Sequence, residues 1–259
     1  EIRQFEAMDF QGAEALNSIC TNLSFVGRNM KRFVITSCTE NEGKSSLVMH
    51  IMQNLAQRNK KVVVVDCDLR KPAQNLVFEQ TLEPEQTLGN LLQEPLEGDS
   101  LIKALIYRKT DNLFCLFSSS PRRSSANLLS SPQMHTILNV LKKNFDYVIL
   151  DSPPMTFFSD CQILADLADR SLLVIRQDRV TDVMANDALD ALENSDCNPL
   201  GYVLNDMRTL ASAGLLGLLD PKYGYGYGSR YGYGYGYGMY GYGKQEKKEE
   251  AKEDDHGTE

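Results

Sequence analysis

The chain has 259 residues, 42% of them hydrophobic, which suits one compact α/β domain with a tail or at most two small domains. A net charge of −8 argues against nucleic acid as a partner. No stretch approaches the roughly 20 apolar residues that cross a bilayer, and no signal peptide is visible, so we expect a cytoplasmic protein.

The cysteines show no pattern that is typical of a metal site or of a disulfide framework. None belongs to a C-x-x-C pair. We interpret them as reduced, partly buried thiols that fill space: Cys20, Cys38, Cys67, Cys115, Cys161 and Cys197.

The first half of the chain alternates predicted helices and strands. Apolar residues spaced by three and four predict helices over 13–25 and 47–55. The strands Arg32–Thr36 and Lys61–Asp66 flank the second helix. Four consecutive valines make the latter strand apolar on both faces, which is typical of the middle of a parallel sheet.

The second half continues this alternation. Further strands are predicted at Leu113–Phe117, Tyr147–Leu150, Ser171–Ile175 and Leu200–Leu204. Further helices are predicted around Leu88–Leu92, Leu101–Tyr107, 134–141 and 182–193. The alternation predicts an α/β fold with a mostly parallel central sheet and helices on both faces.

The composition changes abruptly at Tyr223. Most of the tyrosines follow, largely alternating with glycine: Tyr223, Tyr225, Tyr227, Tyr231, Tyr233, Tyr235, Tyr237, Tyr240 and Tyr242. This segment cannot bury a core, so we expect a disordered tail that ends in a solvated charge run. Such repeats are also typical of adhesive low-complexity segments, and the tail alone leaves both interpretations open.

The segment Cys38–Ser45 lies between a predicted strand and a predicted helix, and its second half matches the P-loop pattern G-x-x-x-x-G-K-[ST]. Gly43 allows the backbone to approach a phosphate, Lys44 can reach the β- and γ-phosphates, and Ser45 offers a hydroxyl to Mg²⁺. N–H groups at the start of the helix complete the anion site. Because no G-x-G-x-x-G links a predicted strand to a predicted helix, a dinucleotide site is excluded.

Acidic residues follow two of the hydrophobic strands. Asp66 and Asp68 follow the valine strand, and Asp151 follows YVIL. Because ligands bind beyond the carboxyl ends of strands in open α/β sheets, Lys44 and these three acids should meet at one edge. Acids in this place are what an NTPase needs to hold Mg²⁺.

Together GKSS, VVVVDCDLRKP and YVILDSPP resemble the Walker A, A′ and B motifs of the bacterial tyrosine kinases of capsule and exopolysaccharide synthesis. These are the CpsD/CapB-like BY-kinases of the P-loop MinD/ParA superfamily. The resemblance covers residues 13 to 208, and the C-terminal tyrosine cluster is the family's other hallmark. General MinD or ParA ATPases have a signature lysine where this chain has Thr39, and they lack the tyrosine tail.

The resemblance implies an autophosphorylating protein-tyrosine kinase with ATP and Mg²⁺ as cofactors. Lys44, Asp66 and Asp68 would be catalytic, with Asp66 orienting or deprotonating the tyrosine hydroxyl. Ser45, Asp68 and Asp151 would hold Mg²⁺. The implied ATP-binding residues are Thr39, Glu40, Asn41, Glu42, Gly43, Lys44, Ser45, Ser46 and Asn205, the last of them at adenine. The tail tyrosines would accept phosphate.

The resemblance also implies an organisation and partners. It divides the chain into an oligomerisation segment (1–30), the kinase domain (31–210), a linker (211–222) and the tail (223–259). The implied partners are a transmembrane activator or chain-length regulator of polysaccharide export, a cognate protein-tyrosine phosphatase and a possible second copy of the chain. The activator would hold the protein at the inner face of the membrane.

Three departures leave a second function open. The family's E-x-x-R-x-x-R helix, which packs subunits into a ring, here reads Glu14, Asn17 and Cys20. Glu40 and Glu42 place two carboxylates in the P-loop, where they would repel phosphates unless they point to solvent. Arg122 and Arg123 replace an expected proline- and glycine-containing segment, either as phosphate contacts or as a solvated pair. The alternative is a P-loop ATPase scaffold or nucleotide switch in the same machinery.

Overall fold

A computed structural model describes residues 10–27, 29–72, 87–93, 107–118, 121–122, 124–155 and 159–207. The predicted linker and tail, and with them every candidate acceptor tyrosine, lie outside these residues. Within the described ranges no helix is both long and apolar enough to cross a membrane.

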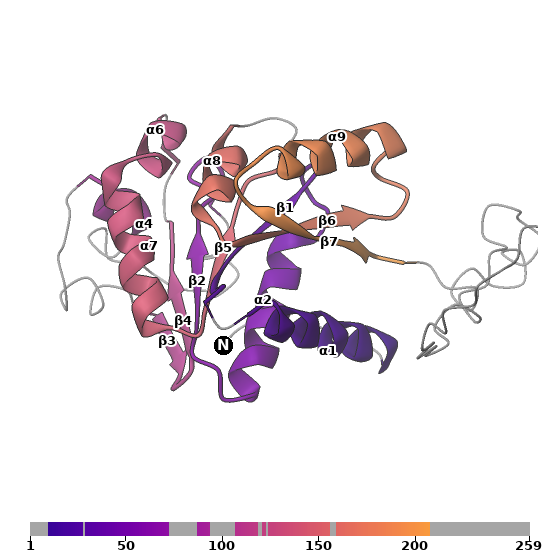
Figure 1. The fold of residues 1–259 in the computed structure, drawn as a ribbon, viewed down its shortest axis with the longest axis horizontal. Coiled ribbons are helices and arrows are strands. Elements are labelled where there is room, and N and C mark those ends of the chain that lie inside the picture. Colours follow the sequence, from indigo (N-terminus) through magenta and orange to yellow (C-terminus); the bar gives the residue numbers. More distant parts are fainter. Residues whose placement is uncertain are drawn as a thin grey trace, which may run out of the picture. The chain divides into compact units, whose positions relative to one another are not determined.

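The centre of the fold is a seven-stranded sheet in the order β3-β4-β2-β5-β1-β6-β7 (Figure 1). Every pairing is parallel except that of β3 with β4, which is antiparallel. The strands are β1 (Arg32–Ser37), β2 (Val62–Asp66), β3 (Tyr107–Thr110), β4 (Leu113–Leu116), β5 (Tyr147–Asp151), β6 (Arg170–Arg176) and β7 (Asn198–Asn205). The sheet is thus the predicted one, with an antiparallel edge strand added.

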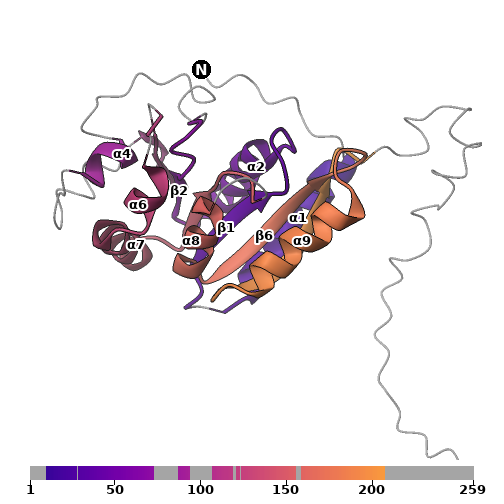
Figure 2. The same ribbon diagram turned by 90° about the horizontal axis from the view of Figure 1, so that it is seen from above.

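Helices cover both faces of this sheet (Figures 1 and 2). One face carries α1 (Phe10–Phe25) and α2 (Lys44–Gln57). The other carries α4 (Leu88–Leu91), α6 (Ser125–Leu129), α7 (Pro132–Asn144), α8 (Asp160–Leu167) and α9 (Asp182–Glu193). This arrangement confirms the predicted α/β class.

The valines of β2 show why the strand occupies the middle of the sheet. Val63 and Val65 belong to the hydrophobic cluster under α7 and α8, while Val62 and Val64 belong to the cluster under α2. All four are at most 1% exposed. Because successive side chains of a strand point to opposite faces, only a strand covered on both sides can be apolar throughout.

Two helices begin where local chemistry favours a start. Ser131 precedes α7, accepts a hydrogen bond from the Met134 N–H at 3.3 Å and is followed by Pro132 at the first helical position. Thr181 caps α9 in the same way, by accepting a bond from Met184 N–H. These caps fix the ends from which each helix packs on the sheet.

The structure corrects one element and adds others. Tyr107, predicted to end a helix, opens the strand β3, and the rest of that predicted helix (101–106) lies outside the described residues. The helices α6 and α8 were not predicted. β3 has only four residues and α6 only five, so neither offers enough periodicity to be recognised.

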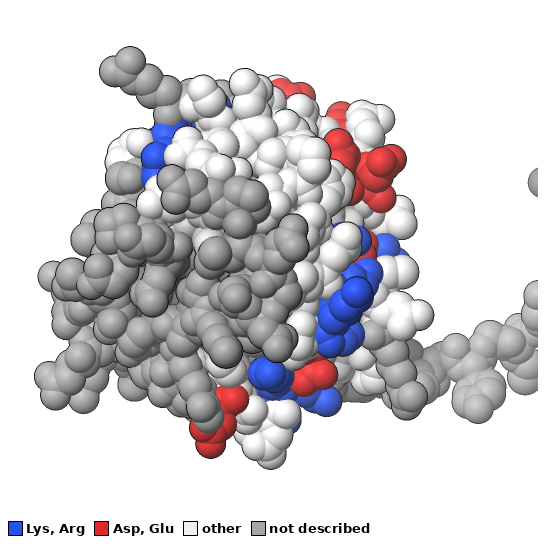
Figure 3. All heavy atoms as spheres, turned by 90° about the vertical axis from the view of Figure 1, so that its left-hand side faces the viewer, with Lys and Arg blue, Asp and Glu red and all other residues white. Residues whose placement is uncertain are grey.

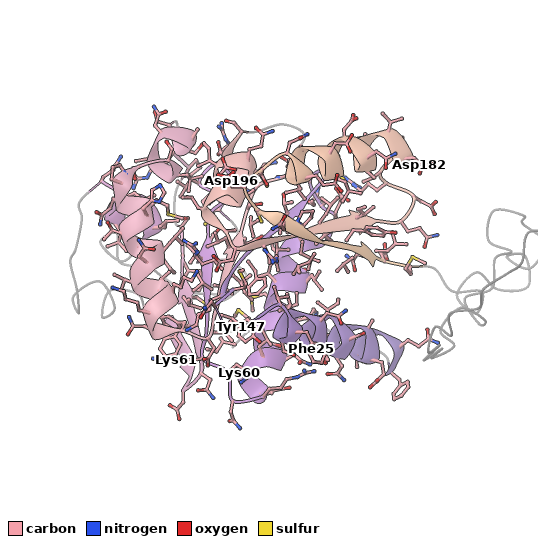
Figure 4. All side chains as sticks on the ribbon, viewed as in Figure 1. Phe25, Lys60, Lys61, Tyr147, Asp182 and Asp196 are labelled. Atoms are coloured by element: carbon pink, nitrogen blue, oxygen red, sulfur yellow. The ribbon has the colours of Figure 1, made fainter. Side chains whose placement is uncertain are left out.

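The amino end of the sheet carries no feature of the predicted site. Lys61 lies just before β2, with its ammonium group 5.4 Å from the ring centre of Phe114 and 5.0 Å from that of Phe145 (Figure 4). Such cation–π contacts stabilise the end of a sheet without supplying chemistry. Among the described residues visible in Figure 3, both acidic and basic side chains occur, and the basic ones form no broad patch.

Asn17 and Cys20 stand where the ring motif of the resembled family has arginine, and both contact helix α2 of the same chain. Asn17 Oδ1 accepts hydrogen bonds from Asn54 Nδ2 at 2.9 Å and from Arg58 Nη2 at 3.1 Å. Cys20 is fully buried, with its sulfur 3.9 Å from the carbonyl oxygen of Ile51. Both side chains therefore serve packing within one chain.

Candidate active site

A cavity of about 620 Å³ opens at the carboxyl ends of the central strands. Its lining includes Ser37, Thr39, Glu40, Asn41, Glu42, Gly43, Lys44, Ser45, Ser46, Asp68, Arg70, Lys71, Pro72, Pro121 and Pro154. The loop between β1 and α2 and the first turn of α2 therefore contribute every P-loop residue expected at the phosphates. A cavity of this size at this edge of an open α/β sheet is typical of a ligand site.

Gly43 occupies a position that only glycine fits. Its φ is +84°, and a Cβ atom there would lie 2.2 Å from Nδ2 of Asn205. Asn205 Nδ2 donates a hydrogen bond to the carbonyl oxygen of Glu42 at 2.8 Å, so the end of β7 supports the P-loop. The left-handed conformation turns the chain from the loop into α2.

The ammonium group of Lys44 lies 2.6 Å from Oδ1 of Asp151 and 3.3 Å from Oγ of Ser45. Burial lowers the pKa of Lys44, but the Asp151 carboxylate outweighs it, with smaller contributions from Asp68 and Asp66, and the pKa is raised overall. Lys44 is therefore a permanent cation at physiological pH. This confirms that Lys44 and the three acids meet at one edge.

Asp66 and Asp151 stand side by side at the ends of β2 and β5, where they are register partners. Each is 1% exposed. Asp68, two residues beyond β2, lines the cavity, and its Oδ1 accepts the N–H groups of Arg70 at 3.2 Å and Lys71 at 2.9 Å. The backbone turn after β2 thus fixes the carboxylate that faces the cavity.

The two P-loop glutamates do not present bare charges to a phosphate. Glu42 is 1% exposed, and its Oε1 accepts hydrogen bonds from the backbone N–H and the hydroxyl of Thr39. Its Oε2 accepts the N–H of Arg176 at 3.0 Å. Glu40 pairs with Lys71 at 2.7 Å. Glu42 therefore does not point to solvent, and its hydrogen bonds within the protein tie the loop to β6.

The spacing Thr39-x-x-Glu42 is that of a capping box, in which a hydroxyl residue and a glutamate three residues later exchange hydrogen bonds. This spacing is visible in the sequence alone. It identifies Glu42 as a positioning residue for the loop.

One ion pair of the site has no local signal in the sequence. Arg70 Nε lies 2.8 Å from Oδ2 of Asp160 and Arg70 Nη2 lies 3.0 Å from Oδ1, so the two side chains form a bidentate pair. Asp160 is fully buried at the start of α8. The pair anchors the loop after β2, and with it Asp68, to a helix 90 positions further along the chain.

The far end of the loop is held by Arg176. Its Nη1 donates to the carbonyl oxygen of Asn41 at 3.1 Å, and its Nη2 lies 2.6 Å from Asp206 Oδ2. Asn41 has a φ of +63°, a conformation that asparagine tolerates better than most residues. Asn205, predicted to meet adenine, stands beside this arrangement, and its role at the base stays a prediction.

The residues present fit a magnesium ion that arrives with a nucleotide. No cluster of three or more metal-ligating side chains occurs among the residues that the structure describes. Mg²⁺ is commonly held by one or two carboxylates together with substrate phosphates and water. Ser45, Asp68 and Asp151, beside Lys44, provide such a partial ligand set.

The thiols beside the loop are poorly suited to redox chemistry. Cys38 is fully buried; burial and the nearby Glu42 raise its pKa to about 12. Burial also raises the pKa of Cys67 well above its usual value. Because the thiolate is the reactive form, these cysteines fill space, as the sequence suggested.

Comparison with known proteins extends this description. The family model of an AAA domain (AAA_31) matches residues 34–187. Tyrosine-protein kinase YwqD of Bacillus subtilis is 34% identical over 195 residues, which cover 74% of this chain and 80% of that protein. Tyrosine-protein kinase CpsD of Streptococcus pneumoniae serotype 4 is 30% identical over 195 residues, which cover 75% and 84%.

Among solved structures, the chimerical protein CapA2B2 superposes with a TM-score of 0.69 at 25% identity. The match covers 76% of this chain and 85% of that one. The range that the family model matches, residues 34–187, includes the P-loop and both acidic strand ends.

Proposed function

The chain belongs to the family of bacterial tyrosine-protein kinases, and from this premise we propose that it transfers the γ-phosphoryl group of ATP to the tyrosines of its own C-terminal segment. The observation that carries this proposal is the convergence of Lys44, Asp66, Asp68 and Asp151 at the carboxyl edge of the sheet, beside the P-loop cavity that Lys44 and Asp68 line. Phosphoryl transfer depends mainly on positioning and charge stabilisation, which this cluster supplies.

The proposed reaction needs a proton acceptor and a cation. Asp66 takes the proton of the tyrosine hydroxyl while the tyrosine oxygen forms a bond to the γ-phosphorus and the bond to the β-phosphate oxygen breaks, leaving ADP. Lys44 stabilises the charge on the transferring group. Ser45, Asp68 and Asp151 would hold Mg²⁺, which would supply further charge neutralisation.

The nine tail tyrosines are the proposed acceptors. Glycine on alternate positions leaves each tyrosine sterically accessible. A glycine-rich segment of about 35 residues has a root-mean-square span of about 30–35 Å, enough to reach the site of a neighbouring copy. Each phosphate adds about −1.5 to −2 charges, so we propose that phosphorylation releases an assembly through repulsion.

The proposal also covers the cellular role of the protein and its partners. The names of the relatives support a role in regulating capsular or exopolysaccharide synthesis and export, one of them being called a putative tyrosine-protein kinase in the cps region. We propose a transmembrane activator that holds the protein at the inner face of the membrane, a phosphatase that resets the tail, and self-association.

A second candidate function has one observation in its favour. Asn17 and Cys20 replace the ring-forming arginines and contact α2, so the ion pairs that arginines would make at those positions cannot form. A protein that cannot place its tail in a neighbour's site would bind ATP without phosphorylating tyrosine. This describes a nucleotide-dependent scaffold.

The two functions separate in one experiment with Asp66→Asn and a matched control, Asp187→Asn, which changes an exposed aspartate on α9. We expect Asp66→Asn to reduce phosphotyrosine formation about 10²- to 10⁴-fold while ATP affinity changes little. Asp187→Asn should leave both unchanged. Wild-type protein that binds ATP but forms no phosphotyrosine, even with the cytoplasmic part of the activator added, would favour the scaffold.

A further inference from the structure

A second cavity, of about 470 Å³, adjoins the P-loop cavity. Six of its lining residues also line the P-loop cavity: Glu40, Asp68, Arg70, Lys71, Pro121 and Pro154. Arg122 completes the described lining and belongs to this second cavity alone. A group bound there would sit beside Asp68 and Arg122.

The basic residues of the second cavity differ in how their charge is used. Arg70 is neutralised by its bidentate pair with Asp160, and Lys71 pairs with Glu40. Arg122, by contrast, donates from its guanidinium to amide oxygens, those of Asn90 and Gln93. Both partners are neutral, and no carboxylate of the described residues pairs with Arg122, so it is the residue there best suited to bind an anion.

The surrounding chain positions this arginine. Its backbone N–H donates to the carbonyl oxygen of Leu69 at 2.7 Å, which joins it to the loop that carries Asp68. A Cβ atom on Gly89 would lie 2.8 Å from Nε of Arg122, so the glycine leaves room for the guanidinium. The two amide bonds use two of the five N–H donors of the side chain. Arg122 is therefore both oriented and able to donate further bonds.

We propose that Arg122 binds the phosphate of an already phosphorylated tyrosine while a neighbouring tyrosine of the same tail occupies the catalytic site. This inference rests on the proposed kinase function. A guanidinium forms paired, charge-assisted hydrogen bonds with phosphate, which an ammonium group does not reproduce. Glu40 and Asp68 also line the cavity, but Glu40 pairs with Lys71 and Asp68 is a proposed magnesium ligand.

The tail carries tyrosines at short, regular intervals, as occupation of two adjoining sites by one tail requires. Residues two apart in an extended chain point to the same side and are about 6.8 Å apart. Tyr231, Tyr233, Tyr235 and Tyr237 follow one another at this interval. A first phosphate on such a run would improve binding of its neighbours, so the tail would be phosphorylated in runs from a first site.

Binding measurements test this without relying on transfer. The full chain, with its nine tail tyrosines replaced by phenylalanine so that its own tail does not compete, is mixed with Mg²⁺ and a non-hydrolysable ATP analogue. The probes are synthetic peptides of residues 229–239, either unmodified or carrying phosphotyrosine at the position of Tyr235. Fluorescence anisotropy of labelled peptides gives the two dissociation constants and their ratio.

With the wild-type side chains at the cavity, we expect the dissociation constant of the phosphorylated peptide to be lower than that of the unmodified peptide by about tenfold or more. Arg122→Gln should abolish the preference for the phosphorylated peptide. Arg122→Lys keeps the charge but loses the paired guanidinium donors, so it should retain part of that preference. Lys143→Gln, which removes an exposed charge on α7, should leave the ratio unchanged.

A preference that is absent from the wild-type protein, or that survives in a folded Arg122→Gln protein, overturns the inference. Transfer to the unmodified peptide, measured in parallel with ATP, reports on the proposed function separately. A protein that transfers phosphate but shows no phosphopeptide preference keeps the kinase proposal and loses the subsite.

Discussion

Lys44 of the P-loop and Asp151 at the end of β5 form an ion pair of 2.6 Å, with the two side chains 10% and 2% exposed. The pair joins positions 107 residues apart in the chain and connects the Walker A loop to the Walker B strand. A buried charge without its partner is strongly destabilising, so this contact links the stability of the fold to the chemistry of the site.

The pair predicts that Lys44→Met destabilises the protein as well as removing phosphoryl transfer. Losing one partner should lower the free energy of unfolding by about 3 kcal/mol, because Asp151 is left buried without its cation. Urea denaturation at pH 7.5 measures this change.

The matched experiment adds Asp151→Asn to Lys44→Met. The double variant should recover part of the loss, since the uncompensated carboxylate is gone. If the double variant loses as much free energy of unfolding as the two single variants lose together, the side chains are not directly coupled.

Gly43 and Gly201 provide a matched pair of glycines. Both have positive φ, but a Cβ on Gly43 would collide with Asn205, whereas a Cβ on Gly201 meets nothing within 4 Å. Gly43→Ala should weaken ATP binding at least about tenfold, because the loop must shift. Gly201→Ala should cost about 1–2 kcal/mol of stability through backbone strain alone.

Isothermal titration with ATP and denaturation of each variant separate these effects. Unchanged ATP affinity in Gly43→Ala would show that the loop conformation does not control nucleotide binding.

The cysteines should resist alkylation while the protein is folded. All are buried; burial raises the pKa of Cys20 and Cys197 to about 11 and that of Cys38 to about 12. Iodoacetamide at pH 7.5 should therefore leave the intact mass unchanged within minutes and modify the thiols after denaturation. Rapid labelling of Cys38 in the folded protein, with loss of ATP affinity, would restore a redox role for this loop.

Asp169 should make stability depend on acidic pH. Burial raises its pKa, but hydrogen bonds from Arg32, Lys142 and the N–H of Lys31 outweigh burial and hold the pKa well below its usual range. A depressed folded-state pKa gives stability that is fully present above about pH 4–5 and is lost as the pH falls through the folded-state value.

Asp169→Asn should lower stability at pH 7 by about 2 kcal/mol and should reduce the loss of stability below pH 4. Denaturant midpoints between pH 2 and pH 7 for both proteins measure this. Identical pH dependence in the variant would mean that other carboxylates dominate acid unfolding.

Much of the fold follows from patterns that the chain carries locally. The four valines of β2 predicted a central strand, and the predicted helix at 182–193 coincides with α9. The P-loop and the acids after β2 and β5 could be placed at one edge, because parallel strands bring their carboxyl ends together. These predictions needed only periodicity and strand order.

The parts that could not be predicted depend on contacts between distant residues. Arg70 and Asp160 pair across 90 positions, and neither position has a motif that indicates the other. Asn205 supports the P-loop from 163 residues away. Sequence patterns report the period of an element and its ends, whereas these contacts arise only once the sheet has assembled.

The most direct test of the central proposal is the intact mass of dephosphorylated protein after incubation with ATP and Mg²⁺, with and without the cytoplasmic part of the activator. Lys44→Met, shown by circular dichroism to be folded, is the control. We predict several phosphate additions, all mapping to residues 223–242 and absent from the control. No addition under either condition, with ATP still bound, would contradict the kinase proposal and leave the nucleotide-dependent scaffold.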